Sequence, residues 1–351
     1  MKFNVQVKKH ILKFKFDAGT SRGVLKKKTV YYVLLSSKEK PTAVALGECS
    51  FIPGLSIDKE DDYEQKLVEA CEKLAEGDER NHLRLIDYPS IRFGIETALL
   101  DFKNQCKHVL FPSPFTNGRN SIQINGLVWM GSMDFMQKQV AEKLSKGIRC
   151  IKLKIGGLNI EEELSLIQSI REIYSPKVLE IRVDANGAFT MSEIEDVLNR
   201  LGELKVHSIE QPIMPGQFDE MAYLAKYSPV PIALDEELIA IKNLENKEKL
   251  VELIKPQYLI LKPSLLGGFA ACDEWITIAK RFKVEWWVTS ALESNIGLNA
   301  IAQWVAILNN DMPQGLGTGM LYTNNIASPL YLVGDKLNYN VKHVWDNSYF
   351  Q

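Results

Sequence analysis

Five charged residues recur at regular intervals after position 150 of the chain: Lys154, Asp184, Glu210, Asp235 and Lys262. Each stands at or next to the end of a short apolar segment that is typical of a buried β-strand. Subtracting residue numbers gives intervals of 30, 26, 25 and 27 residues, each about the length of one strand and one helix. Because parallel strands closed into a barrel direct their carboxyl ends to one mouth, we expect these side chains to surround one cavity.

Three of the five are carboxylates, which would repel one another unless a cation lay between them. An all-oxygen set formed by Asp184, Glu210 and Asp235 suits Mg²⁺, with Mn²⁺ as the alternative, better than zinc. Taken singly, each acid also fits a structural role in an Asx turn, a strand end or a helix cap. The five histidines and five cysteines show no paired metal-ligand spacing, so none of them is expected to bind a metal.

Lysines accompany the acids. Lys152 and Lys154 are two positions apart, so in a strand their side chains share one face. An edge strand protected by lysines is the alternative interpretation of this pair. A lysine acts as a base only when its pKa falls, and Lys152, Lys262 and a metal would all lower the pKa of Lys154. A metal and a lysine together predict an enzyme that removes a proton from the carbon next to a carboxylate. The alternative interpretation is an ion-pair network that only fills the barrel mouth.

Other residues near the strand ends could bind substrate. Arg182 lies two residues before Asp184 on the same strand face and could pair with a second anionic group. Ser290 follows the seventh expected strand, and the glycine-rich run Gly315–Gly319 follows the eighth. Backbone amides freed by glycine can bind a carboxylate, although these glycines could equally serve tight turns.

Strands and helices alternate from residue 116 onward, which predicts an α/β fold with a (β/α)8-type, modified TIM barrel over 116–324. A doubly wound open sheet is the alternative, but it would spread the charged residues along a wide edge, and no G-x-G-x-x-G follows the first strand. The expected strands are Ser121–Leu127, Arg149–Ile155, Leu179–Asp184, His207–Glu210, Pro231–Asp235, Tyr258–Lys262, Val284–Thr289 and Gln314–Gly317. The expected helices are Phe135–Lys146, Glu161–Ile173, Ser192–Leu201, Met221–Lys226, Leu244–Leu253, Phe269–Arg281 and Leu298–Leu308.

Residues 1–115 predict an α+β capping domain, completed by about 325–351. Its loops Asp17–Gly23 and Ser50–Leu55 are either plain connections or a lid over a pocket that the barrel supplies. The expected strands are Asn4–Lys15, Thr29–Ser36 and Ala43–Cys49, and the expected helices are Asp61–Leu74 and Pro89 to about Gln105.

Composition narrows the classes of partner. A formal charge of −2 over 351 residues gives no general attraction to nucleic acid or acidic membranes, and the basic cluster Lys26–Lys28 is interpreted as a solvated face. The scattered cysteines indicate reduced thiols, and no apolar run approaches the roughly 18 residues of a membrane helix. We therefore expect a cytoplasmic protein that binds neither nucleic acid nor membranes. The metal and lysine chemistry predicts a small-molecule carboxylate as substrate, and the chain could be a monomer or a homo-oligomer.

Four motifs resemble those of the enolase superfamily, in its muconate-lactonizing-enzyme-like branch: Lys152-Leu153-Lys154, Asp184-Ala185-Asn186, Glu210-Gln211-Pro212 and Asp235-Glu236. The match covers nearly the whole chain. Within that branch, three segments are most similar to the o-succinylbenzoate synthase family of menaquinone biosynthesis: Gly47–Gly54, Leu261–Leu265 and Ser290–Leu298.

The resemblance implies a lyase that dehydrates 2-succinyl-6-hydroxy-2,4-cyclohexadiene-1-carboxylate in the syn sense through an enediolate. It implies Mg²⁺ on Asp184, Glu210 and Asp235. Lys154 would serve as base and then acid, and Lys262 would lie on the opposite face. Catalytic residues are then Lys152, Lys154 and Lys262, and substrate-binding residues are Arg182, Asn186 and Ser290.

Other activities remain open at this point. An N-acylamino-acid racemase would use two lysines as bases. A dipeptide epimerase usually has acids after strand eight, which Gly315–Gly319 lacks. A muconate-type cycloisomerase, a Schiff-base aldolase without metal and a binding-only barrel are further alternatives.

Overall fold

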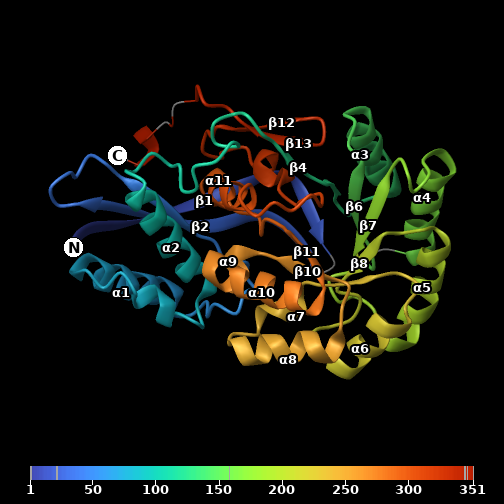
Figure 1. Cartoon of the computed structure of the whole chain (residues 1–351). Helices are drawn as coiled ribbons and strands as arrows, with labels where there is room; N and C mark the ends of the chain where they lie inside the picture. The colour runs from blue at the N-terminus through green and yellow to red at the C-terminus, as the bar shows by residue number, and fades with distance from the viewer. Residues whose placement is uncertain (1, 21–22, 158, 344, 346, 351) are drawn as a thin grey trace.

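The computed structural model describes residues 2–20, 23–157, 159–343, 345 and 347–350. Its N-terminal part is a three-stranded antiparallel sheet in the order β1-β2-β3, covered by two helices at one end of the molecule (Figure 1). The elements are β1 (Phe3–Thr20), β2 (Gly23–Ser37), β3 (Ala45–Cys49), α1 (Tyr63–Glu76), η1 (Asn81–Arg84) and α2 (Pro89–Lys103).

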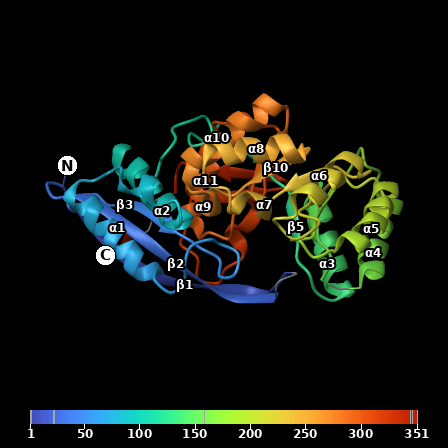
Figure 2. The ribbon, with the colours of Figure 1, turned by 90° about the horizontal axis from the view of Figure 1, so that it is seen from below.

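Strand β2 is buried on both faces, because alternate residues pack into different clusters. Tyr31 and Val33 pack with the residues of α1 and α2, whereas Tyr32 and Leu34 pack with segments that follow the barrel strands, such as Trp129. The N-terminal sheet therefore lies between its own helices and segments that follow the barrel strands. Figure 2, seen from below, shows α1 across this sheet and the barrel beside it.

The prediction of a loop over Asp17–Gly23 is wrong for most of the segment. Asp17 to Thr20 continue β1, and Gly23 begins β2, so the two strands form a long ribbon; positions 21 and 22 lie outside the described residues. The register of the pair shifts between Lys13 and Ala18, and Gly19 forms a bridge with Met130. Pairing with β2, together with the bridge to Met130, satisfies backbone groups that the turn-rich composition had assigned to a loop.

The larger part is a curled parallel sheet in the order β11-β10-β9-β8-β7-β6-β5, which confirms the predicted fold class. The eighth expected strand is reduced to single-residue bridges, Thr289 with Gly315 and Ile124 with Gln314, which close the ring. The strands are β5 (Gly126–Val128), β6 (Cys150–Lys154), β7 (Glu180–Asp184), β8 (Ser208–Glu210), β9 (Ile232–Leu234), β10 (Tyr258–Leu261) and β11 (Glu285–Val288).

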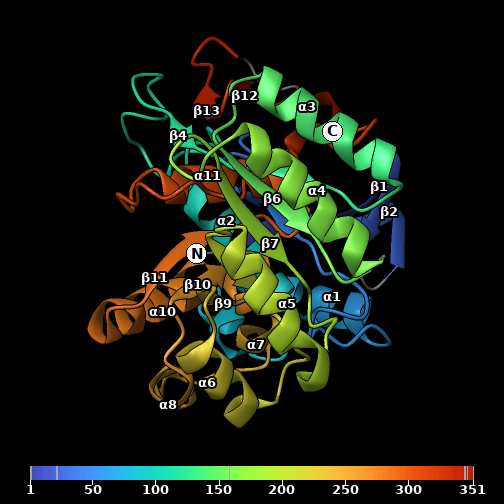
Figure 3. The ribbon, with the colours of Figure 1, turned by 90° about the vertical axis from the view of Figure 1, so that its right-hand side faces the viewer.

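Helices cover the outside of this sheet, and Figure 3 shows α3, α4 and α5 in front of β6 and β7. They are α3 (Met133–Ser145), α4 (Ile160–Ile173), α5 (Met191–Glu203), α6 (Phe218–Tyr227), α8 (Leu244–Ile254), α10 (Gly268–Phe282) and α11 (Asn295–Val305). Two single-turn helices were not predicted, α7 (Glu236–Ile239) and α9 (Pro263–Leu266). Within the described ranges, no helix combines the length and apolarity needed to cross a membrane.

The first expected barrel strand is split in two. Its first half, β4 (Ile122–Gln123), joins a small antiparallel sheet with β12 (Leu330–Val333) and β13 (Lys336–Tyr339), and only β5 belongs to the barrel. Two short 3₁₀ segments complete the element list, η2 (Gly317–Met320) and η3 (Asn347–Phe350).

Helix α2 also supplies a cap to the barrel. The Glu96 side chain accepts hydrogen bonds from the backbone N–H groups of Phe269 and Ala270, at 2.7 and 3.1 Å, in the first turn of α10. A carboxylate at a helix N-terminus satisfies free N–H groups and stabilises the helix dipole.

Candidate active site

Register brings the charged residues of neighbouring strands side by side. Lys154 of β6 pairs with Asp184 of β7, and Asp184 pairs with Glu210 of β8. Asp235 directly follows β9, and Lys262 directly follows β10. All five side chains therefore reach the same end of the sheet, as the regular spacing predicted.

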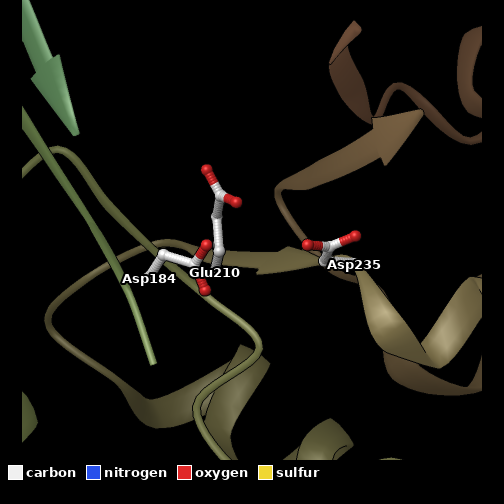
Figure 4. Close-up of side chains that lie close together, drawn as sticks. All are labelled: Asp184, Glu210 and Asp235. Carbon is white, nitrogen blue, oxygen red and sulfur yellow. The ribbon is translucent and has the colours of Figure 1, made fainter. Parts of the chain in front are cut away.

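The three carboxylates gather at the barrel mouth (Figure 4). Asp184, Glu210 and Asp235 each offer one oxygen, and these oxygens lie within 4.8 Å of one another. All three residues are at most 1% exposed. Two of their oxygens, Oε1 of Glu210 and Oδ1 of Asp235, are buried without a hydrogen-bond partner in the part of the chain that the structure describes. Such a site fits a hard divalent cation, which would satisfy those oxygens.

The pKa values of these acids are shifted in different directions. Burial, together with Asp184 and Asp235, raises the pKa of Glu210 to about 7. Burial also opposes ionisation of Asp184, but Lys152 and Lys154 outweigh it and hold the pKa of Asp184 below its usual range. The cluster is thus crowded with negative charge that a cation would stabilise.

Three lysines surround this cluster. The Lys152 ammonium donates to Asp184 Oδ2 at 2.8 Å and to Glu210, while that of Lys262 donates to Asp235. Lys154 donates to Asp184 Oδ2 and Asn186 Oδ1, both at 2.6 Å. Burial lowers the pKa of Lys154, and the charges of Lys152 and Lys262 lower it further. The nearby Asp184 carboxylate raises this pKa, but by less. The pKa of Lys154 is thus lowered in the direction that a lysine base requires, and its role as a base stays a prediction.

Residues just after the strands orient the charged groups, and most of these roles were missed. The Asn186 backbone donates to Asp184 Oδ1 at 3.0 Å, and its side-chain amide donates to Glu236 at 2.9 Å. Gln211 accepts from the backbone N–H groups of Asp235 and Glu237. Both Asn186 and Gln211 have positive φ angles, 47° and 39°. A strained position directly after a strand is not visible in a hydrophobic pattern.

A cavity of about 580 Å³ opens above the lysines. Lys152, Lys154 and Lys262 line its charged floor, and Asn186 lies beside them. The remaining wall on the side of the N-terminal part is largely apolar, and its lining includes Phe16, Ile52, Leu55, Leu292 and Met320. The loop Ser50–Leu55 therefore contributes to the cavity, as its lid interpretation requires, while its motion stays a prediction.

Comparison with known proteins places this arrangement in a family. A family model described as enolase C-terminal domain-like matches residues 136–334. The chain belongs to this family. A curated relative, an o-succinylbenzoate synthase from Desulfotalea psychrophila, is 44% identical over 92% of this chain and 95% of its own length.

Solved structures of the enolase family agree with the fold. The crystal structure of MenC from Desulfotalea psychrophila has a TM-score of 0.85 and 40% identity, covering 96% of this chain and 100% of that one. A muconate lactonizing enzyme from Pseudomonas fluorescens, complexed with muconolactone, has a TM-score of 0.84 and 22% identity over 98% and 96% of the two chains. At that identity the likeness concerns the fold alone.

Two expected substrate-binding residues of this enolase-family chain form hydrogen bonds with other residues of the protein. Arg182 is fully buried, does not line the cavity, donates to Glu180 at 2.7 Å and stacks on Trp287 at 3.9 Å, so its assignment to substrate is not supported. Ser290 does line the cavity, but its hydroxyl donates to Glu293 at 2.5 Å and accepts from Thr318 at 2.9 Å. Its single proton is therefore committed to a protein carboxylate.

Proposed function

We propose that the chain is an o-succinylbenzoate synthase, a metal-dependent hydro-lyase that converts 2-succinyl-6-hydroxy-2,4-cyclohexadiene-1-carboxylate to 2-succinylbenzoate. The observation that carries this proposal is the 44% identity to such an enzyme over 92% of the chain. The placement of one lysine with a lowered pKa beside a carboxylate cluster supports it. In this proposal the reaction belongs to menaquinone biosynthesis and the protein acts in the cytoplasm.

The metal site of the proposal consists of Asp184, Glu210 and Asp235, and the ion is Mg²⁺, with Mn²⁺ sharing its preference for oxygen ligands. When bound, the ion supplies positive charge that stabilises a substrate carboxylate as negative charge builds up on it.

Lys154 is proposed as the group that moves the proton. As a free amine, it takes the proton from the ring carbon that bears the carboxylate, and the C–H electron pair moves into the substrate. The resulting Lys154 ammonium then gives that proton to the hydroxyl on the adjacent carbon, which leaves as water while the ring becomes aromatic. Since one residue serves both steps, proton and hydroxyl leave from the same face. Asn186 Oδ1, 2.6 Å from the Lys154 nitrogen, holds it in place.

The other two lysines stay charged in this proposal. Burial lowers the pKa of both lysines, but nearby acids raise it by more. Asp235 and Glu236 do so for Lys262. Asp184 and Glu210 do so for Lys152. Lys262 lies across the mouth from Lys154, with three strands of the sheet between them, where it can stabilise the developing negative charge and contact the ring as a cation. Lys152 positions the carboxylates of Asp184 and Glu210.

Turnover of the synthetic diene carboxylate, followed by its loss of absorbance and by chromatography of the product, tests this function. We expect turnover to stop when EDTA removes divalent ions and to return with Mg²⁺ or Mn²⁺. EDTA-resistant turnover would overturn the metal requirement, and absence of turnover with Mg²⁺ present would overturn the proposed reaction.

Racemisation of an N-acylamino acid is a second candidate. It is favoured by Lys154 on β6 and Lys262 after β10, which both line the cavity with three strands of the sheet between them. In deuterated water, two bases would exchange the α-proton of both enantiomers. Loss of exchange for only one enantiomer in Lys262→Ala would support this activity.

A further inference from the structure

A buried lysine connects the N-terminal sheet to the cavity wall. Lys28 of β2 is 6% exposed, whereas its neighbours Lys26 and Lys27 are exposed, so the interpretation of the whole cluster as a solvated face is wrong. The Lys28 ammonium donates to the backbone carbonyls of Ala291 and Leu292, at 2.5 and 3.0 Å. These two residues follow β11 and line the cavity.

The segment that Lys28 holds has an unfavourable backbone conformation. Leu292 has φ 64°, in the left-handed region, which costs a residue with a side chain about 1 kcal/mol or more. The Tyr322 hydroxyl also donates to the Leu292 carbonyl, at 2.7 Å. A lysine is rarely buried without partners, and here its two hydrogen-bond acceptors are both main-chain atoms of this strained wall.

A second buried charge from the same sheet secures the continuation of this wall. Glu48 of β3 accepts hydrogen bonds from the Ser294 backbone at 2.8 Å, from the Ser294 hydroxyl at 2.5 Å and from the Gly297 backbone at 2.8 Å. These donors form the N-terminus of α11. Two charges from the N-terminal part thus hold both ends of a short segment that faces the cavity.

The wall in turn supports the apolar side of the cavity. Ala291 packs in one cluster with Ile52 and Leu55 of the loop that faces the barrel. Lys28 itself makes no contact with the lysines and acids of the floor, and it is not a lining residue. It holds the Ala291 and Leu292 carbonyls directly, and its charge also lies near Glu293, which accepts a hydrogen bond from Ser290 of the same wall.

We propose that Lys28 is a positioning residue that fixes the Ala291–Leu292 wall against the substrate and so sets substrate affinity without taking part in proton transfer. This inference rests on the proposed function for its kinetic readout. The structural part of the proposal is that the Lys28 ammonium keeps the wall ordered, and the order of the wall can be measured without any substrate.

The test compares Lys28→Met with Lys247→Met. Lys247 of α8 is a matched control because it is 1% exposed, donates to the Ala271 carbonyl at 3.1 Å and to Glu274 at 2.8 Å, and does not line the cavity. For Lys28→Met we expect KM for the diene carboxylate to rise about tenfold while kcat stays within threefold. For Lys247→Met we expect a lower Tm and an unchanged KM.

Hydrogen exchange gives the readout that does not depend on activity. Peptides covering 289–296 should exchange faster in Lys28→Met and at the parent rate in Lys247→Met. Tyr322→Phe, which removes the other side-chain donor to Leu292, should change KM and exchange in the same direction by a smaller factor and serves if Lys28→Met does not fold. Unchanged KM and unchanged exchange in the folded variants would overturn the proposal. Absence of turnover in the parent would overturn the proposed function alone, since the exchange result would still decide the role of Lys28.

Discussion

The floor and the apolar wall of the cavity are built in different ways. The floor consists of charged side chains at the ends of regular parallel strands, and its lysines are all paired with acids of neighbouring strands. The wall consists of apolar side chains on loops and on the β1–β2 ribbon, such as Phe16, Ile52 and Leu55. Sheet register fixes the floor, whereas loop packing fixes the wall. Changes to the floor should therefore alter kcat, and changes to the wall should alter KM.

The largest effect is expected from the floor. Lys154→Ala removes the proposed proton-transfer group, and general acid–base catalysis contributes about 10² to 10⁴-fold, so we expect kcat to fall by at least about 10³-fold because both steps use this residue. The measurement is turnover of the diene carboxylate with saturating Mg²⁺, with Tm and affinity for 2-succinylbenzoate to show that the site is intact.

Lys249→Ala, at an exposed position on α8, is the control and should keep parental kcat. More than a tenth of parental kcat in Lys154→Ala would contradict its role, and the division between floor and wall would then fail at its most important residue.

A smaller effect is expected from the wall. Leu55→Ala removes apolar surface that borders the cavity, and loss of about 1 to 2 kcal/mol of contact corresponds to a KM increase of roughly 5- to 30-fold with kcat nearly unchanged. Steady-state kinetics measures both parameters. Leu83→Ala, an exposed leucine of the same part of the chain away from the cavity, should change neither. A fall in kcat without a change in KM would show that the wall also orders the floor.

The smallest catalytic effect is expected at Asp58, which follows the cavity-lining loop Ser50–Leu55 and holds its end against α2. Asp58, at the end of this loop, accepts from the Ser90 backbone and hydroxyl, at 3.1 and 2.7 Å, and burial raises its pKa to about 7. The folded chain keeps this proton to higher pH than the unfolded chain, whose aspartates titrate near 3.9, so the contribution to stability is complete below about pH 4 and is lost as pH rises towards 7.

Asp58→Asn abolishes this titration while its amide oxygen can still accept from Ser90. Relative to the parent, the variant should gain up to about 4 kcal/mol of unfolding free energy between pH 4 and pH 8, measured by urea denaturation at both values. Its kcat should match the parent's. A stability difference that does not change with pH would show that Asp58 does not titrate in this range.

The contrast between floor and wall also explains what could be predicted from the sequence. The positions of Lys154, Asp184, Glu210, Asp235 and Lys262 follow from strand periodicity and repeat length, both of which are local properties of the chain. Arg182 shows the limit of that reasoning. It does share a strand face with Asp184, but two residues correspond to about 6.6 Å along a strand, so its guanidinium lies deeper in the barrel on Trp287.

Lys28 could not be predicted for a related reason. Three consecutive lysines indicate a solvated face unless the strand is covered on both sides, and that cover is supplied by barrel segments more than 250 residues later in the chain. The Asp17–Gly23 segment was misassigned for a different reason. Ala18, Gly19 and Thr20 pair with Leu25, Val24 and Gly23, so the hairpin continues through residues whose composition is typical of a loop. A contact between distant segments decided the first case, and a local strand pairing decided the second.

Two glutamates of the N-terminal part, Glu96 and Glu48, end on the first turns of α10 and α11. A barrel produced without residues 1–115 would leave the amide groups of those turns without their acceptors. The two parts of the chain should consequently unfold in a single cooperative transition, and neither is expected to persist as an autonomous fragment.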